Sequence, residues 1–180
     1  MKRMASPLVL VLVFIFGELF AQSLPGKIIV GYWHNWGYTP NTVFLRDIPE
    51  EYDVVNVAFA TPTEILGANM QFLPDPGIYP NEQTFIEEVA ALRGMGKKVV
   101  ISIGGANDPI SLLDEDDIQT FVSSMSTIID TYGFDGVDID LENGSIILDS
   151  GDNDFRAPTT QRIINLIEAF TQLLELYPNM

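Results

Sequence analysis

Three acidic residues alternate along one short stretch of the chain, Gly136-Val-Asp138-Ile-Asp140-Leu-Glu142. Side chains alternate between the two faces of a β-strand, so the acids would point one way and the three aliphatic residues the other, with about 6.6 Å between successive acidic Cα atoms. Three carboxyl groups this close repel one another when all are charged, which favours keeping a proton among them. The pattern therefore predicts a strand that holds a proton donor, with Glu142 as its outermost acid.

Two other interpretations fit the spacing alone. Acidic side chains on a strand can simply face water. The pattern Asp-x-Asp-x-Glu also supplies the oxygen ligands that Mg²⁺ or Ca²⁺ prefers. A solvated surface and a hard-metal site therefore stay open beside acid catalysis when only this stretch is considered.

The acidic strand is the last of four short runs rich in Val and Ile, at residues 27–31, 53–59, 98–103 and 136–141. Apolar residues spaced three and four apart predict helices over 82–95, 117–132 and 160–176. Strands alternating with helices predict an α/β fold of parallel βα units. Four such units make half of a TIM (β/α)8 barrel, which typically has about 250 residues. A complete, small, open α/β sheet is the alternative.

The first residues have the layout of a secretory signal peptide. Lys2 and Arg3 precede an apolar run, and a small residue, Ala21, follows it. The run is short for a membrane span, which needs about 20 residues. We therefore expect residues 1–21 to be removed and residues 22–180 to form the N-terminal half of an incomplete barrel. The mature protein would be extracellular, with no membrane attachment.

Composition excludes several classes of protein. The chain has no cysteine, which rules out a disulfide framework and a thiolate zinc site. Its 25 Asp and Glu outnumber 9 Lys and Arg, for a formal net charge of −16. Removal of the leader, with Lys2, Arg3 and Glu18, would make the net charge −17. Such a charge repels nucleic-acid phosphates and anionic membranes, whereas a neutral polysaccharide is compatible with it.

Two motifs resemble those of a known family, the family 18 glycoside hydrolases, which are the chitinases and their relatives. That family's acidic signature, Asp-x-x-Asp-x-Asp-x-Glu, is matched by Asp135, Asp138, Asp140 and Glu142. Its Ser-x-Gly-Gly motif, at the end of the third barrel strand, is matched by Ser102, Gly104 and Gly105. The resemblance extends over residues 27–178, and it implies that the four βα units are the first half of a TIM barrel.

The resemblance implies a role for each acid. The residue matching Glu142 is the general acid that protonates the glycosidic oxygen. The residue matching Asp140 orients the substrate's own 2-acetamido group, whose carbonyl oxygen attacks the anomeric carbon, and the residue matching Asp138 shares a proton with Asp140. This retaining, substrate-assisted mechanism needs no carboxylate nucleophile, metal or cofactor. The implied substrates are β-1,4-linked N-acetylglucosamine polymers, namely chitin and chito-oligosaccharides.

Supporting parts are implied for three further residues. Ser102 is expected to hydrogen-bond to Asp138, as its family counterpart does. Tyr32 matches a family tyrosine near the same aspartate. Asp135 has the opposite strand parity, so we interpret it as structural, bracing the start of the acidic strand.

Aromatic residues and glycines are candidates for contact with the sugar. Aromatic rings stack on pyranose rings, so Trp36 and Trp33 are expected to line the cleft, with Phe59 as a floor. Gly104 and Gly105 would let the backbone approach the sugar. Packing at the rim is the alternative for each tryptophan, and a simple βα turn for the paired glycines.

Several expectations concern the whole protein. An endo-β-N-acetylglucosaminidase acting on glycans and a non-catalytic chitin-binding lectin are the alternative activities. The missing strands five to eight imply that residues 22–180 alone are inactive, and the full-length protein is expected to be a monomer. The stretch Asn143-Gly-Ser145 fits a glycosylation sequon. A glycan beside Glu142 would obstruct the cleft, so we do not expect modification there.

Overall fold

The computed structural model describes residues 24, 26–37 and 42–180, so the expected signal peptide lies outside the described residues. The strands are β1 (Val30–His34), β2 (Val54–Pro62), β3 (Met70–Gln71), β4 (Lys98–Gly105) and β5 (Gly136–Leu141). The α-helices are α1 (Glu82–Gly94), α2 (Glu115–Tyr132) and α3 (Gln161–Leu176). Two short 3₁₀ helices are η1 (Leu45–Asp47) and η2 (Asn143–Ile146). None of the described helices is both long and apolar enough to cross a membrane.

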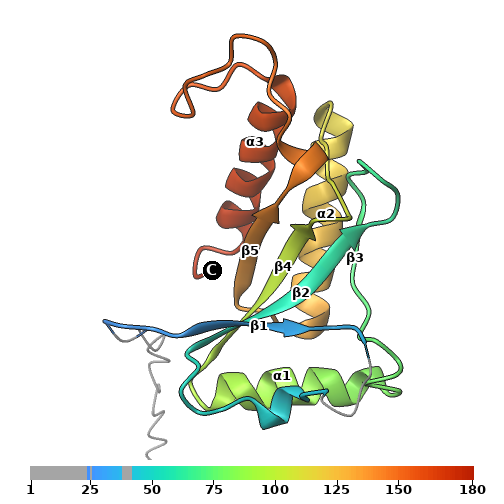
Figure 1. Cartoon of the computed structure of the whole chain (residues 1–180), viewed down its shortest axis with the longest axis vertical. Helices are drawn as coiled ribbons and strands as arrows, with labels where there is room; N and C mark the ends of the chain where they lie inside the picture. Colours follow the sequence, from blue (N-terminus) through green and yellow to red (C-terminus); the bar gives the residue numbers. More distant parts are fainter. Residues whose placement is uncertain (1–23, 25, 38–41) are drawn as a thin grey trace, which may run out of the picture.

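The main strands lie parallel in the order β1-β2-β4-β5, which is also their order along the chain, and β3 pairs antiparallel with β2. Helices follow β2, β4 and β5. Figure 1 shows α2 and α3 behind the sheet, which twists so strongly that β1 lies crosswise to β5. Parallel strands added in sequence, each returned by an outer helix, are the repeating unit of a (β/α) barrel. The predicted α/β class and parallel βα units are therefore confirmed.

The helices begin and end where the sequence supplies caps. The side chain of Asn81 accepts a hydrogen bond from Gln83 N at 3.1 Å to begin α1, and that of Asp114 accepts one from Asp117 N at 3.0 Å to begin α2. Gly133 ends α2 in the left-handed conformation, at φ 70°. These capping residues fix the helix boundaries within one or two residues of those predicted.

The two faces of the sheet differ in chemistry. The helix-facing side is apolar and closed, and it supplies Val55, Val57, Val99, Ile101 and Ile103 to the core. These side chains pack with buried helix residues such as Phe85 and Phe121, both at 0% exposure. The opposite face carries small and polar residues, including the buried Asn56 and Ser102. Because the aliphatic side chains are segregated on one face, the other is left for polar side chains.

The first strand is displaced from its predicted position. The sequence predicts a strand over residues 27–31, whereas β1 covers Val30–His34. Its limits are set by pairing with β2, which runs from Val30 opposite Val54 to His34 opposite Ala58. The prediction began too early because it relied on β-branched residues alone. The aromatic residues that follow them are equally suited to a strand. Because β1 extends to His34, strand alternation determines the face on which Tyr32 and Trp33 lie.

Candidate active site

The register between β4 and β5 aligns the two recognised motifs. Ser102 lies opposite Asp138, and Gly104 lies opposite Asp140. β5 covers the predicted residues, Gly136–Leu141. The sequence pattern and the pleat thus agree on the acidic face of β5, which is the face away from the helices.

Asp138 is the hub of the polar contacts on this face. Its Oδ2 atom accepts a hydrogen bond from Ser102 Oγ at 2.7 Å and a second from Tyr32 OH, also at 2.7 Å. Three strands, β1, β4 and β5, therefore meet at one carboxylate oxygen. The expected contact between Ser102 and Asp138 is confirmed, and Tyr32 lies where the prediction requires.

The environment of Tyr32 alters its acidity. Partial burial raises the pKa of its phenol above the usual value of 10.0, and the hydrogen bond donated to Asp138 raises it further. A hydrogen bond with the side chain of Asn56 acts in the opposite direction and is the weaker influence. Tyr32 therefore stays protonated, as a donor to Asp138, throughout the neutral range.

Asp140 and Glu142 continue along the same edge. Asp140 is partly buried and Glu142 is exposed. The backbone of Glu142 is extended, at φ −121° and ψ 172°, so the alternation of β5 continues through it. Its carboxyl does not cap the 3₁₀ turn that follows. In the part of the chain that the structure describes, no three His, Asp or Glu side chains converge on a possible metal position.

Asp135 lies at the other end of β5 and has different partners. Its carboxylate contacts Arg93 Nε at 3.1 Å and Lys98 Nζ at 3.5 Å, and it accepts a hydrogen bond from Val99 N at 3.0 Å. The side chain is only 10% exposed. These contacts tie the start of β5 to β4 and α1, which supports the interpretation of Asp135 as structural.

The paired glycines make room for protein atoms. Gly104 has φ 97°, and a Cβ there would collide with the carbonyl oxygen of Asp140. Gly105 has φ 78°, and a Cβ there would lie 3.0 Å from the ring of Phe59. Both positions therefore require glycine because of the turn and the packing around it. Their approach to a sugar stays a prediction.

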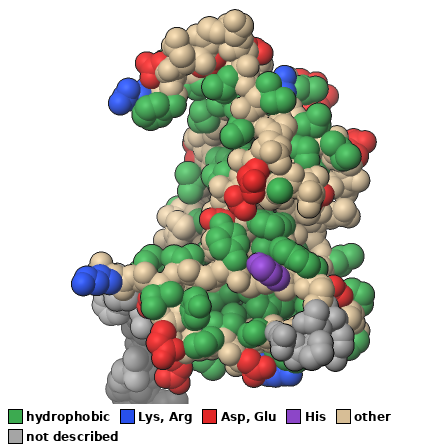
Figure 2. All heavy atoms as spheres, in the orientation of Figure 1, with side chains coloured by type: hydrophobic (Ala, Val, Ile, Leu, Met, Phe, Trp, Pro, Cys, Tyr) green, Lys and Arg blue, Asp and Glu red, His purple; other side chains and the backbone are tan. Residues whose placement is uncertain are grey.

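Aromatic rings gather beside the acidic edge. Trp36 stacks on Phe59 with ring centroids 5.8 Å apart and on His34 at 4.5 Å. The ring centroids of Tyr32 and Phe59 are 6.4 Å apart. The side of this group that faces solvent includes Trp36, which is 48% exposed. Figure 2 shows the histidine on the open face among hydrophobic side chains, with acidic side chains above it. The surface formed by Tyr32, His34, Trp36 and Phe59 is called here the aromatic platform.

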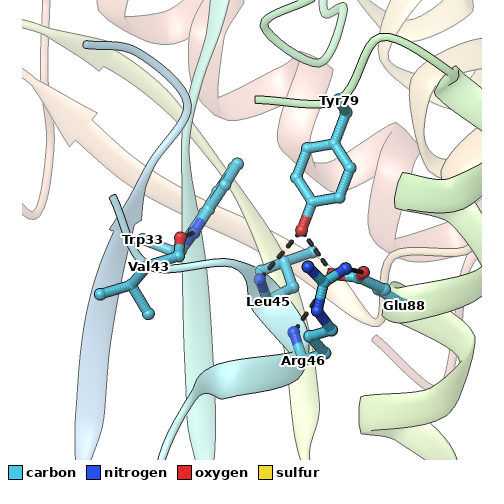
Figure 3. A network of polar contacts seen from close by, with 6 residues as sticks. All are labelled: Trp33, Val43, Leu45, Arg46, Tyr79 and Glu88. Carbon is cyan, nitrogen blue, oxygen red and sulfur yellow. Dashed lines mark hydrogen bonds and ion pairs between the residues drawn. The ribbon is translucent and has the colours of Figure 1, made fainter. Parts of the chain in front are cut away.

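Trp33 is absent from this platform, which contradicts its predicted place in the cleft. It lies between Tyr32 and His34 on β1, so the pleat turns its side chain to the opposite face. It is 5% exposed and packs against Tyr79 and Phe85. Its Nε1 atom donates to Val43 O at 2.7 Å (Figure 3). The packing alternative is the correct one for Trp33.

The network drawn in Figure 3 anchors the connection after β1. Tyr79 donates its hydroxyl proton to Glu88 and accepts a hydrogen bond from Leu45 N at 2.9 Å. Arg46 forms an ion pair with Glu88 at 2.6 Å. Burial, followed by the bond to Glu88, raises the pKa of Tyr79 far above its ordinary value. The network holds Trp33 and residues 43–46 on the helix side, away from the acidic edge.

Some residues of the site were not anticipated from the sequence. Asn56 is 4% exposed on β2 and bonds to the side chain of Tyr32. Asparagine within a run of Val and Ala is unusual for a strand, which was an available signal. Asn143 and Ser145 follow Glu142 and bond to the loop after β4. The sequence stretch had been considered only as a sequon, and no local pattern could identify those partners.

Parallel βα units with carboxylates grouped where a strand ends define a barrel-type α/β protein with an acidic site at the carboxyl ends of its strands. The sequence matches the family described as glycosyl hydrolases family 18 over residues 28–177. The chain belongs to that family.

Curated relatives and solved structures carry consistent names. Chitinase Chi52 of Paenibacillus xylanexedens is 44% identical, over 82% of this chain and 28% of that protein. Chitinase D of Niallia circulans is 43% identical, over 84% of this chain and 29% of that protein. The structure of a family GH18 chitinase from Chromobacterium violaceum is 35% identical with a TM-score of 0.73, over 89% of this chain and 41% of that one. The chain thus spans less than a third of these curated relatives' length.

Proposed function

We propose that this chain carries the proton donor of an extracellular chitin hydrolase and that Glu142 is that donor. The observation that carries the proposal is the meeting of Tyr32 and Ser102 on Asp138 Oδ2, each at 2.7 Å. These contacts support the assignment of Asp138 as the inner acid of the family signature, and the alternation of the strand supports a common face for Asp140 and Glu142. The names of the relatives, chitinases in each case reported above, support the choice of substrate.

The contacts of Asp138 constrain where protons lie. An oxygen that accepts two hydroxyl hydrogen bonds has both lone-pair directions in use. A proton shared with Asp140 would therefore be carried by the other oxygen of Asp138, Oδ1. Hydroxyl donors leave the carboxylate able to take up that proton, whereas a fixed cation would oppose it. Asp138 would in this way hold Asp140 in position for the substrate's acetamido group.

The proposed reaction proceeds in two steps. Glu142 gives its proton to the glycosidic oxygen while the acetamido carbonyl oxygen forms a bond to the anomeric carbon, and the bond from that carbon to the leaving oxygen breaks. Water then attacks the anomeric carbon, Glu142 takes the proton from that water, and the acetamido group is regenerated. Two displacements at one carbon give net retention of configuration. Trp36 and Phe59 of the aromatic platform would bear the face of a sugar ring.

We further propose that residues outside this chain complete the active site. Both edge strands expose apolar side chains, among them Val30 at 48% and Ile139 at 53%. Unpaired edges of this kind favour association with other chains. Residues 22–180 expressed alone are therefore expected to aggregate or to lack activity. Hydrolysis of a chitin oligosaccharide by that segment as a monomer would contradict this expectation.

The experiment that tests the proposal compares the full-length protein with its Glu142→Gln variant. The variant keeps the size of the side chain, but its amide is not acidic enough to protonate a leaving group. We expect hydrolysis of a chito-oligosaccharide to fall by a factor of about 10²–10⁴, with binding retained. Proton NMR of the first product should show the β-anomer. Equal binding with no hydrolysis by either form would identify a lectin, and cleavage of glycoprotein glycans alone would identify the endo-β-N-acetylglucosaminidase.

A further inference from the structure

The three residues after Glu142 each contact the loop that follows β4. That loop, residues 106–110, and the turn at residues 143–145 come from neighbouring βα units. The backbone N–H of Ser145 also donates to Glu142 O at 3.1 Å, which closes the turn directly on the acid. The position of Glu142 is thus linked to a segment more than thirty residues earlier in the sequence, about one βα unit away.

Asn143 makes the first of these contacts. Its Nδ2 atom donates to Ala106 O at 2.7 Å. Its φ is +47°, a conformation that most side chains avoid and asparagine tolerates. The left-handed residue bends the chain sharply away from the direction of β5, immediately after the acid. A short polar side chain at this position therefore serves both the bend and the bond to Ala106.

Gly144 makes the second contact by close packing. A Cβ at this position would lie 3.3 Å from Pro109 and 3.6 Å from Leu66. Leu66 N donates to Pro109 O at 2.9 Å, so the segment after β2 joins the same cluster. A larger residue at position 144 would push the turn away from the loop.

Ser145 makes the third contact and is the most enclosed of the three. It is 3% exposed, and its Oγ atom accepts a hydrogen bond from Ile110 N at 2.9 Å. Loss of this hydroxyl would leave the backbone N–H of Ile110 buried without an acceptor, which is unfavourable. The turn and the loop are thereby held together on both sides of Gly144.

We infer that Asn143, Gly144 and Ser145 are positioning residues that hold the carboxyl of Glu142 at the height of the substrate's glycosidic oxygen. The inference rests on the proposed function, because it concerns the acid assigned there. A single 3₁₀ turn at a strand end has few internal contacts, so the place of Glu142 depends on what the turn is bound to. The bond from Asn143 Nδ2 also engages the nitrogen that glycosylation of the sequon would require. The sequon residues thus have a different function, as an anchor for the acid.

The test uses Asn143→Gly and Ser145→Ala in the full-length protein. Asn143→Gly keeps the left-handed backbone and removes only the amide, and its exposed position favours correct folding. Ser124→Ala is the matched control. Ser124 Oγ also accepts a hydrogen bond from a backbone N–H, that of Met70 at 3.0 Å, but this bond joins α2 to β3 and does not involve the turn after Glu142. Each variant is assayed on a chito-oligosaccharide and on an aryl chitobioside with an activated nitrophenolate leaving group.

A displaced acid matters most for a leaving group that needs its proton. We expect Asn143→Gly and Ser145→Ala to lower kcat on the oligosaccharide about 10-fold with KM within about twofold, and to leave the activated aryl substrate within about twofold of the parent. Ser124→Ala should lower thermal stability but leave both rates unchanged. Equal losses on both substrates, or losses matched by Ser124→Ala, would overturn the inference. If Glu142→Gln remained fully active in the same assays, the proposed function would fail instead.

Discussion

Two aspartates, Asp135 directly before β5 and Asp138 within it, lie in opposite settings. Asp135 is enclosed by two cations, Arg93 at 3.1 Å and Lys98 at 3.5 Å. Three residues further along, within β5, Asp138 is held by two neutral hydroxyls, Tyr32 and Ser102. No ion pair in the described residues involves Asp138, Asp140 or Glu142.

The difference shows how one strand serves stability and chemistry at once. A cation fixes a carboxylate in its charged form, which suits an acid that only joins elements together. Hydroxyl donors orient a carboxylate and still permit a proton on its second oxygen. Barrels generally place stabilising residues at the N-terminal ends of strands and reactive ones at the C-terminal ends, and the stretch from Asp135 to Glu142, which contains β5, follows that division.

Among changes at Asp138, Asp135 and Tyr32, the largest expected effect comes from Asp138→Asn. We expect kcat on a chito-oligosaccharide to fall about 100-fold, because the amide cannot share a proton with Asp140. Thermal stability should change little, since no cation loses its partner. Steady-state kinetics and a melting curve on the same preparation check both statements. A large loss of stability would remove the contrast between Asp138 and Asp135.

Asp135→Asn is the reciprocal change, at the residue directly before the strand. It leaves Arg93 and Lys98 without their carboxylate partner, and we expect the free energy of unfolding to fall by about 1–3 kcal/mol. The cations are partly exposed, which moderates the cost. Urea titration measures the loss, and kcat per folded molecule should stay within about twofold. A strong kinetic effect without destabilisation would show that this acid also serves the reaction.

Tyr32→Phe removes one of the two hydroxyls from Asp138. Ser102 remains, and water can reach the vacated position because Tyr32 is exposed. We therefore expect a loss of about fivefold in kcat, near the value of one hydrogen bond. The KM should be affected less than kcat. No kinetic change would mean that Ser102 alone sets the position of Asp138.

The smallest effect is a difference in stability at high pH. The pKa of Tyr32 is raised in the folded protein above 10.0, so the folded state favours the protonated phenol. The stabilisation by that phenol is complete below pH 10 and is lost as the pH rises through the folded pKa. Denaturant titrations of the parent and Tyr32→Phe should therefore differ by a constant amount up to pH 10 and converge above it. Convergence already near neutrality would contradict the shift.

Local sequence patterns correctly predicted the features that depend on strand alternation and on helix capping. The alternation at residues 136–142 located the acidic face, and the bounds of β5 agree with those predicted. The apolar spacing that predicted a helix over 117–132 located α2 to within two residues. By contrast, β1 was misplaced because its limits depend on pairing with β2. Trp33 was misassigned as a consequence, since a strand boundary decides which alternate residues face inward.

Contacts between distant segments were beyond local reasoning. The interpretation of Asp135 as structural was reached from parity, but Arg93 and Lys98 became its visible partners only in the folded chain. Asn143 and Ser145 form hydrogen bonds with backbone carbonyl and amide groups. Every residue type can supply such a group, so the partner's identity in the sequence does not reveal the bond. Such bonds follow from the arrangement of loops in space, which no periodicity encodes.

The hydrogen bonds between residues 143–145 and residues 106–110 join two connecting loops, so the position of each loop depends on the other. An insertion or deletion in either loop would disturb the other, although surface loops usually vary in length without penalty. Homologues that differ in length here should differ in both loops together. Chimeras made by exchanging one loop alone should be poorly active, whereas joint exchange should preserve turnover.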